Sequence, residues 1–199
     1  MAAETHTLDV HEPSPLAPSW RKVMMWVFII TDGLLFAGLL AGYGYLRIAA
    51  PTWPELSEVF AIPFIALMTF ILITSSATMG SAVAAARMGD RQKTALFLGL
   101  TILGGLAFLS CQAYEWSHLI HEGARLWWNP WGPPQFAASF FVLTGFHGSH
   151  VLSGVIILTI ALIRTLKQKS TAEGIELVGL YWHFVDLVWV FIFTLFYLL

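Results

Sequence analysis

The sequence is poor in cysteine and in charged residues. Cys111 is its single cysteine, which excludes a disulfide within the chain. Only 11% of its 199 residues are charged and no run of basic residues occurs, so we expect no nucleic-acid partner. The sequence also lacks a glycine-rich phosphate loop and a nucleophile paired with a base, which argues against catalysis by this chain alone.

The first 20 residues lack the pattern of a cleavable signal. The segment MAAETHTLDVHEPSPLAPSW is polar, acidic and proline-rich, whereas a signal needs a basic start followed by an apolar core. We therefore interpret residues 1–20 as a short polar cytoplasmic tail.

Hydrophobic residues, by contrast, make up 57% of the chain, and the mean hydropathy is positive. A bilayer core requires about 20 apolar residues per helix. The stretches that carry no charge, or a single acid, predict an all-α integral membrane bundle of five transmembrane helices. We place this domain at 21–199, with spans at 22–48, 59–87, 94–120, 136–165 and 176–198.

The connections between these spans are short, so consecutive helices are expected to pack as antiparallel neighbours. The first connection, AAPTWPELSE, is predicted to be a turn because Pro51 and Pro54 block helix continuation. Small residues in TSSATMGSAVAAA and LTGFHGSHVLSG would let helix backbones approach closely. These features favour a compact bundle.

Basic residues predict the orientation. One side of the predicted bundle holds eight of the ten: Arg21, Lys22, Arg87, Arg91, Lys93, Arg164, Lys167 and Lys169. The other side holds Arg47 and Arg125, together with the tryptophans Trp53, Trp116, Trp127, Trp128 and Trp131. The positive-inside rule places the N-terminus in the cytoplasm and the C-terminus in the periplasm.

Several ionisable residues lie within the predicted spans, where a central Asp costs roughly 2.5 to 3.5 kcal/mol. Spacing of three residues places Glu115 beside His118, His147 beside His150, and His183 beside Asp186 on one helix face. Asp32 differs, because Phe28, Ile29, Leu35 and Phe36 leave it without a polar neighbour on its own helix. Its partner must come from another helix, from water or from a proton of its own.

Two interpretations of these groups compete. Carboxylates and imidazoles on facing helices can hold metals, and Glu115 with His118 has the Glu-x-x-His spacing of such sites. However, Asp186 is expected roughly 15 Å from the cytoplasmic edge and Glu115 roughly 30 Å, which argues against one shared site. A smaller metal site between the spans at 136–165 and 176–198 stays open. The alternative is helix packing. His183 would then bond Asp186, and His147 and His150 would donate to backbone carbonyls or to hydroxyls such as those of Thr144 and Ser153.

Two long segments, FFVLTGFHGSHVLSGVIIL at 140–158 and YWHFVDLVWVFIFTLFYLL at 181–199, resemble subunit III of the haem-copper terminal oxidases. QAYEW at 112–116 and TDGLLFAGLLAGYGYLR at 31–47 are similar to further signatures of that family. The likeness extends from Trp20 onward in the same order and implies the five-helix form of the subunit.

The resemblance implies a non-redox subunit of a proton-pumping cytochrome c oxidase in a prokaryotic inner membrane. It would bind phospholipid but no haem, copper or other metal, since haem and copper belong to subunits I and II. It would pack mainly on subunit I, within a complex that includes subunit II, and support stability and proton uptake. Asp32 matches a buried family glutamate that is one methylene longer, and Glu115, His147, His150, His183 and Asp186 match signature positions.

Alternatives remain open at this point. Within the family, these are subunit III of a quinol oxidase and the related subunit of a nitric oxide reductase, because electron donors dock on other subunits. From another class, a small proton-conducting transporter could use Asp32 and the histidine pairs as a relay, although the sequence has no internal repeat.

Overall fold

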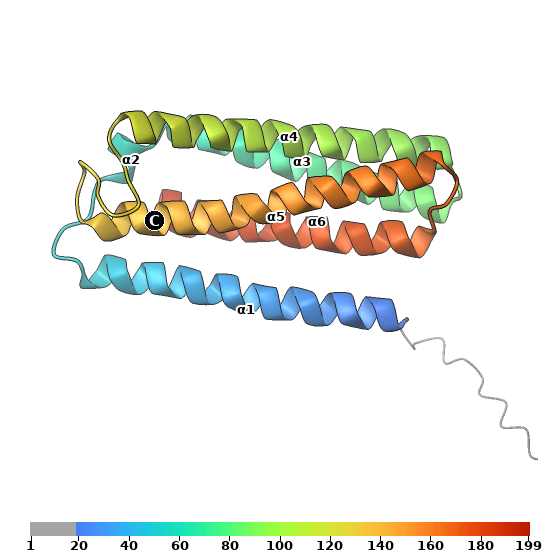
Figure 1. Ribbon diagram of the computed structural model, residues 1–199, viewed down its shortest axis with the longest axis horizontal. Helices are drawn as coiled ribbons and strands as arrows, with labels where there is room; N and C mark the ends of the chain where they lie inside the picture. The colour runs from blue at the N-terminus through green and yellow to red at the C-terminus, as the bar shows by residue number, and fades with distance from the viewer. Residues whose placement is uncertain (1–18) are drawn as a thin grey trace, which may run out of the picture.

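The computed structural model describes residues 19–199, and the predicted tail at 1–20 therefore lies almost wholly outside the described residues. The chain forms α1 (Trp20–Ala49), α2 (Leu56–Val59), α3 (Ile62–Arg87), α4 (Arg91–His121), α5 (Pro134–Leu166) and α6 (Ala172–Ile192) (Figure 1). A π-helical segment, η1 (Phe193–Leu198), continues α6 to the C-terminus. Apart from the one-turn α2, these helices are long and apolar enough to cross a membrane, which confirms the predicted all-α architecture with five spans.

The short helix α2 is the one element that the sequence patterns did not predict. It lies in the segment that Pro51 and Pro54 marked as a turn, and it is only four residues long. Pro54 precedes it, and Glu55 at its N-cap has extended backbone, so the prolines end α1 but leave room for a single helical turn.

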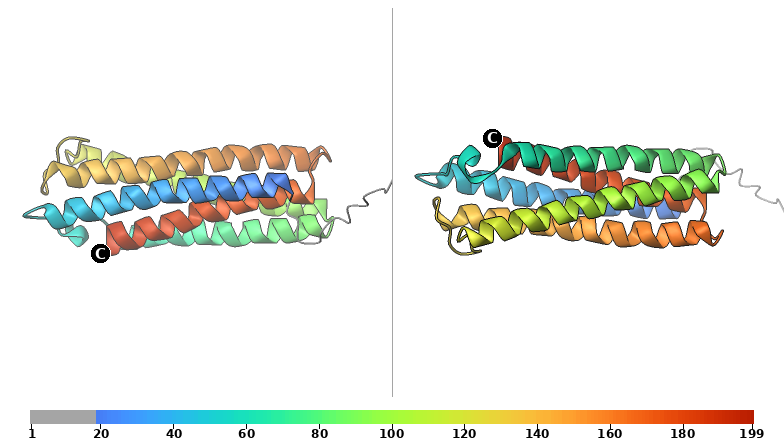
Figure 2. Two further views of the ribbon diagram at one scale, coloured as in Figure 1. Left: turned by 90° about the horizontal axis from the view of Figure 1, so that it is seen from below. Right: turned by 90° about the horizontal axis from the view of Figure 1, so that it is seen from above.

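Four of the long helices form a ring in which α3, α4, α5 and α6 each pack against the next, and α6 closes the ring on α3. Helix α1 lies outside this ring and packs against α5 and α6 (Figure 2). The expectation that consecutive spans are neighbours is therefore wrong for α1 and α3. The 12 residues at 50–61 permit this arrangement, because a chain of that length can extend roughly 40 Å and reach the far side of α6.

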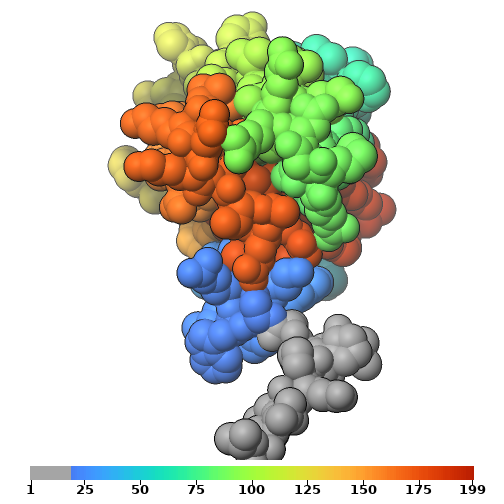
Figure 3. All heavy atoms as spheres, turned by 90° about the vertical axis from the view of Figure 1, so that its right-hand side faces the viewer, coloured from blue at the N-terminus to red at the C-terminus, as the bar shows by residue number. Residues whose placement is uncertain are grey.

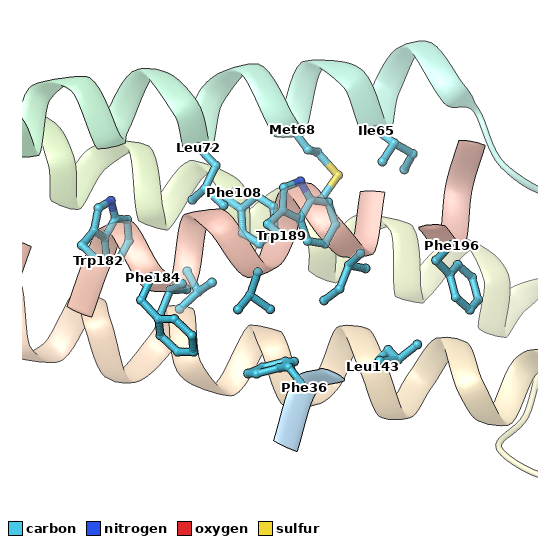
Figure 4. Close-up of a cluster of buried hydrophobic side chains, with 14 of the residues drawn as sticks. Phe36, Ile65, Met68, Leu72, Phe108, Leu143, Trp182, Phe184, Trp189 and Phe196 are labelled. Carbon is cyan, nitrogen blue, oxygen red and sulfur yellow. The ribbon is translucent and has the colours of Figure 1, made fainter. Parts of the chain in front are cut away.

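The core is centred on two tryptophans of α6. Trp182 and Trp189 are fully buried among other apolar side chains (Figure 4). Their indole N–H groups donate to Ser75 Oγ at 3.1 Å and to Thr69 Oγ1 at 2.9 Å. Both bonds link α6 to α3 and satisfy the polar atoms of these large side chains.

Glycines make room for the Trp182 ring. A Cβ added at Gly105 on α4 would lie 2.7 Å from that ring, and one added at Gly154 on α5 would lie 2.9 Å from it. Because no real side chain tolerates such contacts, the ring occupies space that only glycine leaves open. Small residues thus bring α4, α5 and α6 together, as is typical of membrane bundles.

One end of the bundle gathers the start of α1, the α3–α4 turn and the α5–α6 connection (Figure 3). Glu176 of α6 pairs there with Lys22 of α1 at 2.9 Å and with Arg87 of α3 at 3.2 Å. Asp90 begins α4, and the backbone N–H of Lys93 donates to its side chain, which holds the pKa of that carboxyl below its usual value. The eight basic residues that predicted a cytoplasmic side lie at these helix ends or in the α5–α6 connection.

The opposite end contains α2, the α4–α5 loop and the C-terminus (Figure 1). Asn129 organises the loop, because its Oδ1 accepts from the N–H groups of Trp131 and Gly132, both at 2.9 Å. Arg47 near the end of α1 donates to the carbonyl of Leu199, which ties the C-terminus to the outer helix.

Candidate functional site

Asp32 contacts a histidine of another helix. Its Oδ2 lies 3.3 Å from Nε2 of His150 on α5, and the exposed fractions of the two side chains are 12% and 15%. This is an ion-pairing distance without the alignment of a hydrogen bond, since Asp32 Oδ2 has no hydrogen-bond partner. The acid that lacked a neighbour on its own helix therefore finds one across the α1–α5 contact.

The contact made by Nδ1 of His150 indicates which atoms of the Asp32–His150 pair carry hydrogens. Nδ1 lies 2.8 Å from the carbonyl oxygen of Phe146, and because a carbonyl only accepts, Nδ1 must carry a hydrogen. Nε2 is then an acceptor in the neutral ring, so attraction to Asp32 requires one more proton, on the carboxyl or on the ring. The pair is neutral overall in both states, which lowers its cost at membrane depth.

Aromatic and hydroxyl groups surround His150. The rings of Phe36 and Phe146 have centroids 5.3 and 4.7 Å from that of His150. The hydroxyl of Tyr181 on α6 lies 2.6 Å from Ser153 Oγ and donates to the backbone carbonyl of His150 at 3.1 Å. Helices α1, α5 and α6 thus meet at this one residue.

His147, one turn away on α5, is fully buried, and neither of its ring nitrogens has a hydrogen-bond partner. Its ring lies among Phe36, Phe108 and Trp189, with centroid distances of 6.4, 5.7 and 5.1 Å. The expected donation to a carbonyl or hydroxyl is therefore absent for His147, although His150 makes such a bond to Phe146. The aromatic rings that fill the core leave no polar atom within reach of His147.

Glu115 on α4 is buried and is bonded by a different neighbour than expected. Its Oε2 accepts from Gln112 Nε2 at 2.9 Å and from the Tyr197 hydroxyl at 3.2 Å, whereas Oε1 has no partner. His118 instead lies 3.6 Å from the exposed Glu122. Spacing of three residues brings Glu115 and His118 to one side of the helix, but the first points into the bundle and the second to its surface.

His183 and Asp186 lie on α6 where it packs against α3. His183 Nδ1 lies 2.6 Å from Ser76 Oγ of α3, and Asp186 Oδ1 is buried without a hydrogen-bond partner. The expected bond between His183 and Asp186 is not formed, and His183 Nδ1 contacts the serine of the neighbouring helix instead.

These groups occupy separate parts of the bundle. Within residues 19–199, no three histidine, cysteine or carboxylate side chains lie close enough together to hold a metal ion. The ionisable residues instead form three polar contacts, at α1–α5, at α4 with η1, and at α3–α6.

Sequence patterns missed the partners of these groups. Tyr181, Tyr197 and Ser76 each come from a different helix than the ionisable residue they approach, so periodicity along one helix could not identify them. Gln112 was within reach of that reasoning, because it lies three residues before Glu115.

An apolar groove of about 450 Å³ lies beside Asp32 between α1 and α6. Its walls include Gly33, Leu40 and Phe191, and none of its lining residues is charged. A groove of this composition suits a hydrocarbon chain.

Comparison with known proteins places this arrangement in a family. The family described as "Cytochrome c oxidase subunit III" matches residues 19–199. Cytochrome c oxidase subunit 3 of Bacillus sp. (strain PS3) is 34% identical, over 100% of this chain and 95% of the relative. Cytochrome c oxidase subunit 3 of Corynebacterium diphtheriae is 38% identical, over 90% and 88%. Quinol oxidase subunit 3 of Bacillus subtilis (strain 168) is 37% identical, over 87% and 84%.

The family match includes every described residue, and these relatives are covered over most of their own lengths. The chain therefore belongs to the cytochrome c oxidase subunit III family.

Proposed function

We propose that this chain is the non-redox subunit III of a proton-pumping aerobic terminal oxidase and packs on the haem-bearing catalytic subunit. The observation that carries the proposal is the match along the whole described chain to subunit III of oxidases that use different electron donors. Haem and copper would reside in subunits I and II. The comparisons favour this function over a small proton-conducting transporter.

The electron donor distinguishes two forms of this proposal. We favour cytochrome c. Quinol is kept as the alternative, because relatives named for the two donors are similarly identical to the chain. Oxygen uptake by the purified complex tests the choice. Reduced cytochrome c should sustain uptake that a quinol does not, and uptake with quinol alone would favour the quinol oxidase.

The helices and the basic residues support a proposed location and orientation. We propose the plasma membrane of a prokaryote, with the end that gathers Lys22, Arg87 and Arg91 in the cytoplasm and the C-terminus in the periplasm. Labelling an introduced cysteine in the Asn129 loop of intact cells with an impermeant maleimide tests this orientation. Labelling is expected there and not in the α3–α4 turn, and the reverse would contradict it.

The proposed role of the Asp32–His150 pair is to hold α1 on the ring and to support proton uptake and turnover lifetime. Helix α1 has only two buried residues, Phe36 and Tyr43, so an inter-helix pair within the membrane matters more there than in the core. The apolar groove beside it would hold a phospholipid chain. Removing this subunit from the complex should shorten the turnover lifetime while the initial rate of oxygen reduction persists; an unchanged lifetime would contradict the role.

A further inference from the structure

We propose that a pocket at the α2 end of the bundle, between α4 and the start of α3, binds a primary ammonium group. The pocket has a volume of about 250 Å³. One carboxylate, Glu115, lines it together with the rings of Phe60, Phe64 and Tyr114. This ammonium pocket is separate from the apolar groove between α1 and α6. The inference goes beyond the proposed function, because it requires no partner subunit.

The carboxylate of Glu115 is only partly satisfied. The residue is 6% exposed, and its Oε2 accepts from Gln112 at 2.9 Å and from Tyr197 at 3.2 Å. Oε1 is buried and has no hydrogen-bond partner within residues 19–199. The last torsion of a glutamate side chain is soft, so Oε1 can turn toward a donor that enters the ammonium pocket. A charged N–H donor would satisfy this oxygen with a charge-assisted hydrogen bond.

Aromatic rings form much of the pocket wall. Phe64 and Tyr114 are in edge-to-face contact, with ring centroids 5.7 Å apart, and the buried Phe60 lines the same pocket. The faces of such rings attract cations, and rings combined with a carboxylate suit an organic cation. A hydrocarbon chain would leave Oε1 unpaired. A calcium ion is also a poor fit, because it takes about six to eight oxygen ligands and the pocket side chains supply one carboxylate.

Charges at the α2 end also favour a cation. Among the described residues, this end carries four acids and two basic residues: Glu55, Glu58, Glu115, Glu122, Arg47 and Arg125. Neither arginine lines the ammonium pocket, and Arg47 donates to the carbonyl of Leu199. His118 does line the pocket, but it lies 3.6 Å from Glu122, whose carboxylate offsets the charge of a protonated ring.

The ammonium pocket lies near the membrane surface. Helix α4 has 31 residues and is about 46 Å long, whereas a hydrocarbon core is about 30 Å thick. Glu115 lies six residues before His121 at the end of α4, which corresponds to about 9 Å along the axis. With α4 centred in the membrane, Glu115 is therefore at the boundary between hydrocarbon and headgroups. A primary amine can reach this depth from an ethanolamine headgroup or from solution.

Native mass spectrometry of the full chain, purified in detergent and stripped of lipid, tests the ligand. One phosphatidylethanolamine per chain should bind about tenfold more tightly than a phosphatidylcholine with the same acyl chains, which has no N–H group to donate. Binding of free ethanolamine in addition would identify soluble amines as a source, and binding of the lipid alone would identify the headgroup. Equal affinities for the two lipids, without binding of free ethanolamine, would overturn the proposal.

Two glutamates near the end of α4 provide a matched test. Glu115→Gln keeps the shape of the side chain and an oxygen that can accept from Gln112 and Tyr197, so the fold should persist. It should weaken binding of phosphatidylethanolamine about tenfold, because the charge is lost. Glu122→Gln removes the same charge from an exposed residue that does not line the pocket, and it should bind as the unmodified chain does. Equal affinities of the two variants would overturn the proposal.

Tyr114→Leu tests the aromatic wall without changing the charge. Tyr114 is 62% exposed, so the variant should fold, with unchanged helical circular dichroism. Loss of the cation–π attraction should weaken binding of phosphatidylethanolamine about threefold. This variant keeps the proposal testable if Glu115→Gln fails to fold. An unchanged affinity would overturn recognition of the ammonium group in this pocket.

Discussion

Asp32→Asn, combined with His150→Gln in a double-mutant cycle, measures how strongly α1 is coupled to the bundle. The side chains are 3.3 Å apart and almost buried, but the contact lacks hydrogen-bond alignment. Fully buried pairs cost about 3 to 5 kcal/mol when one partner is removed, whereas inter-helix bonds within membranes average about 0.6 kcal/mol and reach about 1.7. Because the pair is neutral overall and imperfectly aligned, we expect a coupling free energy of about 1 kcal/mol.

The assay is unfolding of the purified chain in detergent micelles by added denaturing detergent, followed by helical circular dichroism. Each single variant should lose stability, and the double variant should lose less than their sum. A coupling below about 0.3 kcal/mol would lie within the additivity of independent sites and would refute the inference that this contact holds α1. In the intact complex, Asp32→Asn should assemble normally but shorten turnover lifetime or slow proton uptake, and unchanged kinetics in both would contradict the functional role.

Gly154→Ala should destabilise the chain by about 1 to 3 kcal/mol, because the new Cβ would lie 2.9 Å from the Trp182 ring, whereas Gly148→Ala in the same helix meets no atom within 4 Å. Equal unfolding free energies for these two variants would contradict the tight packing at Trp182. Asp90 has a lowered pKa in the folded chain, so the stability from its cap should be complete above the ordinary value of 3.8 and lost as the pH falls through the lowered value. Thermal unfolding from pH 5 downward should show this loss, and Asp90→Asn should reduce the pH dependence; identical curves would show that the cap contributes nothing measurable.

The predicted spans depended on hydropathy, and the structure confirms five helices because a spanning segment must satisfy its backbone hydrogen bonds internally. Helix neighbours were harder to predict. The position of α1 beside α5 and α6 depends on contacts such as Asp32 with His150, which are 118 residues apart and leave no periodic signal along either helix. The expectation that consecutive spans are neighbours holds for α3, α4, α5 and α6, but connection length did not single out α1, because 12 residues separate α1 from α3 and 12 also separate α4 from α5.

In the candidate site, too, tertiary contacts could not be predicted from the sequence. Spacing along a helix predicted His118 as the neighbour of Glu115, whereas Glu115 bonds Gln112 on α4 and Tyr197 from the far end of the chain. Burial of His147 among aromatic rings also depends on tertiary packing, since the residues of its own helix offer hydroxyls that point elsewhere. Ionisable residues could thus be recognised from the sequence, whereas their partners required the fold.

Co-purification most directly tests the central claim that this chain is subunit III of a terminal oxidase. The affinity-tagged chain, extracted from its native membrane in a mild detergent, should retain a haem-bearing catalytic subunit in equal amount, seen in the reduced-minus-oxidised spectrum and by mass spectrometry. Recovery of the chain without a haem-bearing partner, together with proton conduction by the chain alone in liposomes, would contradict the claim.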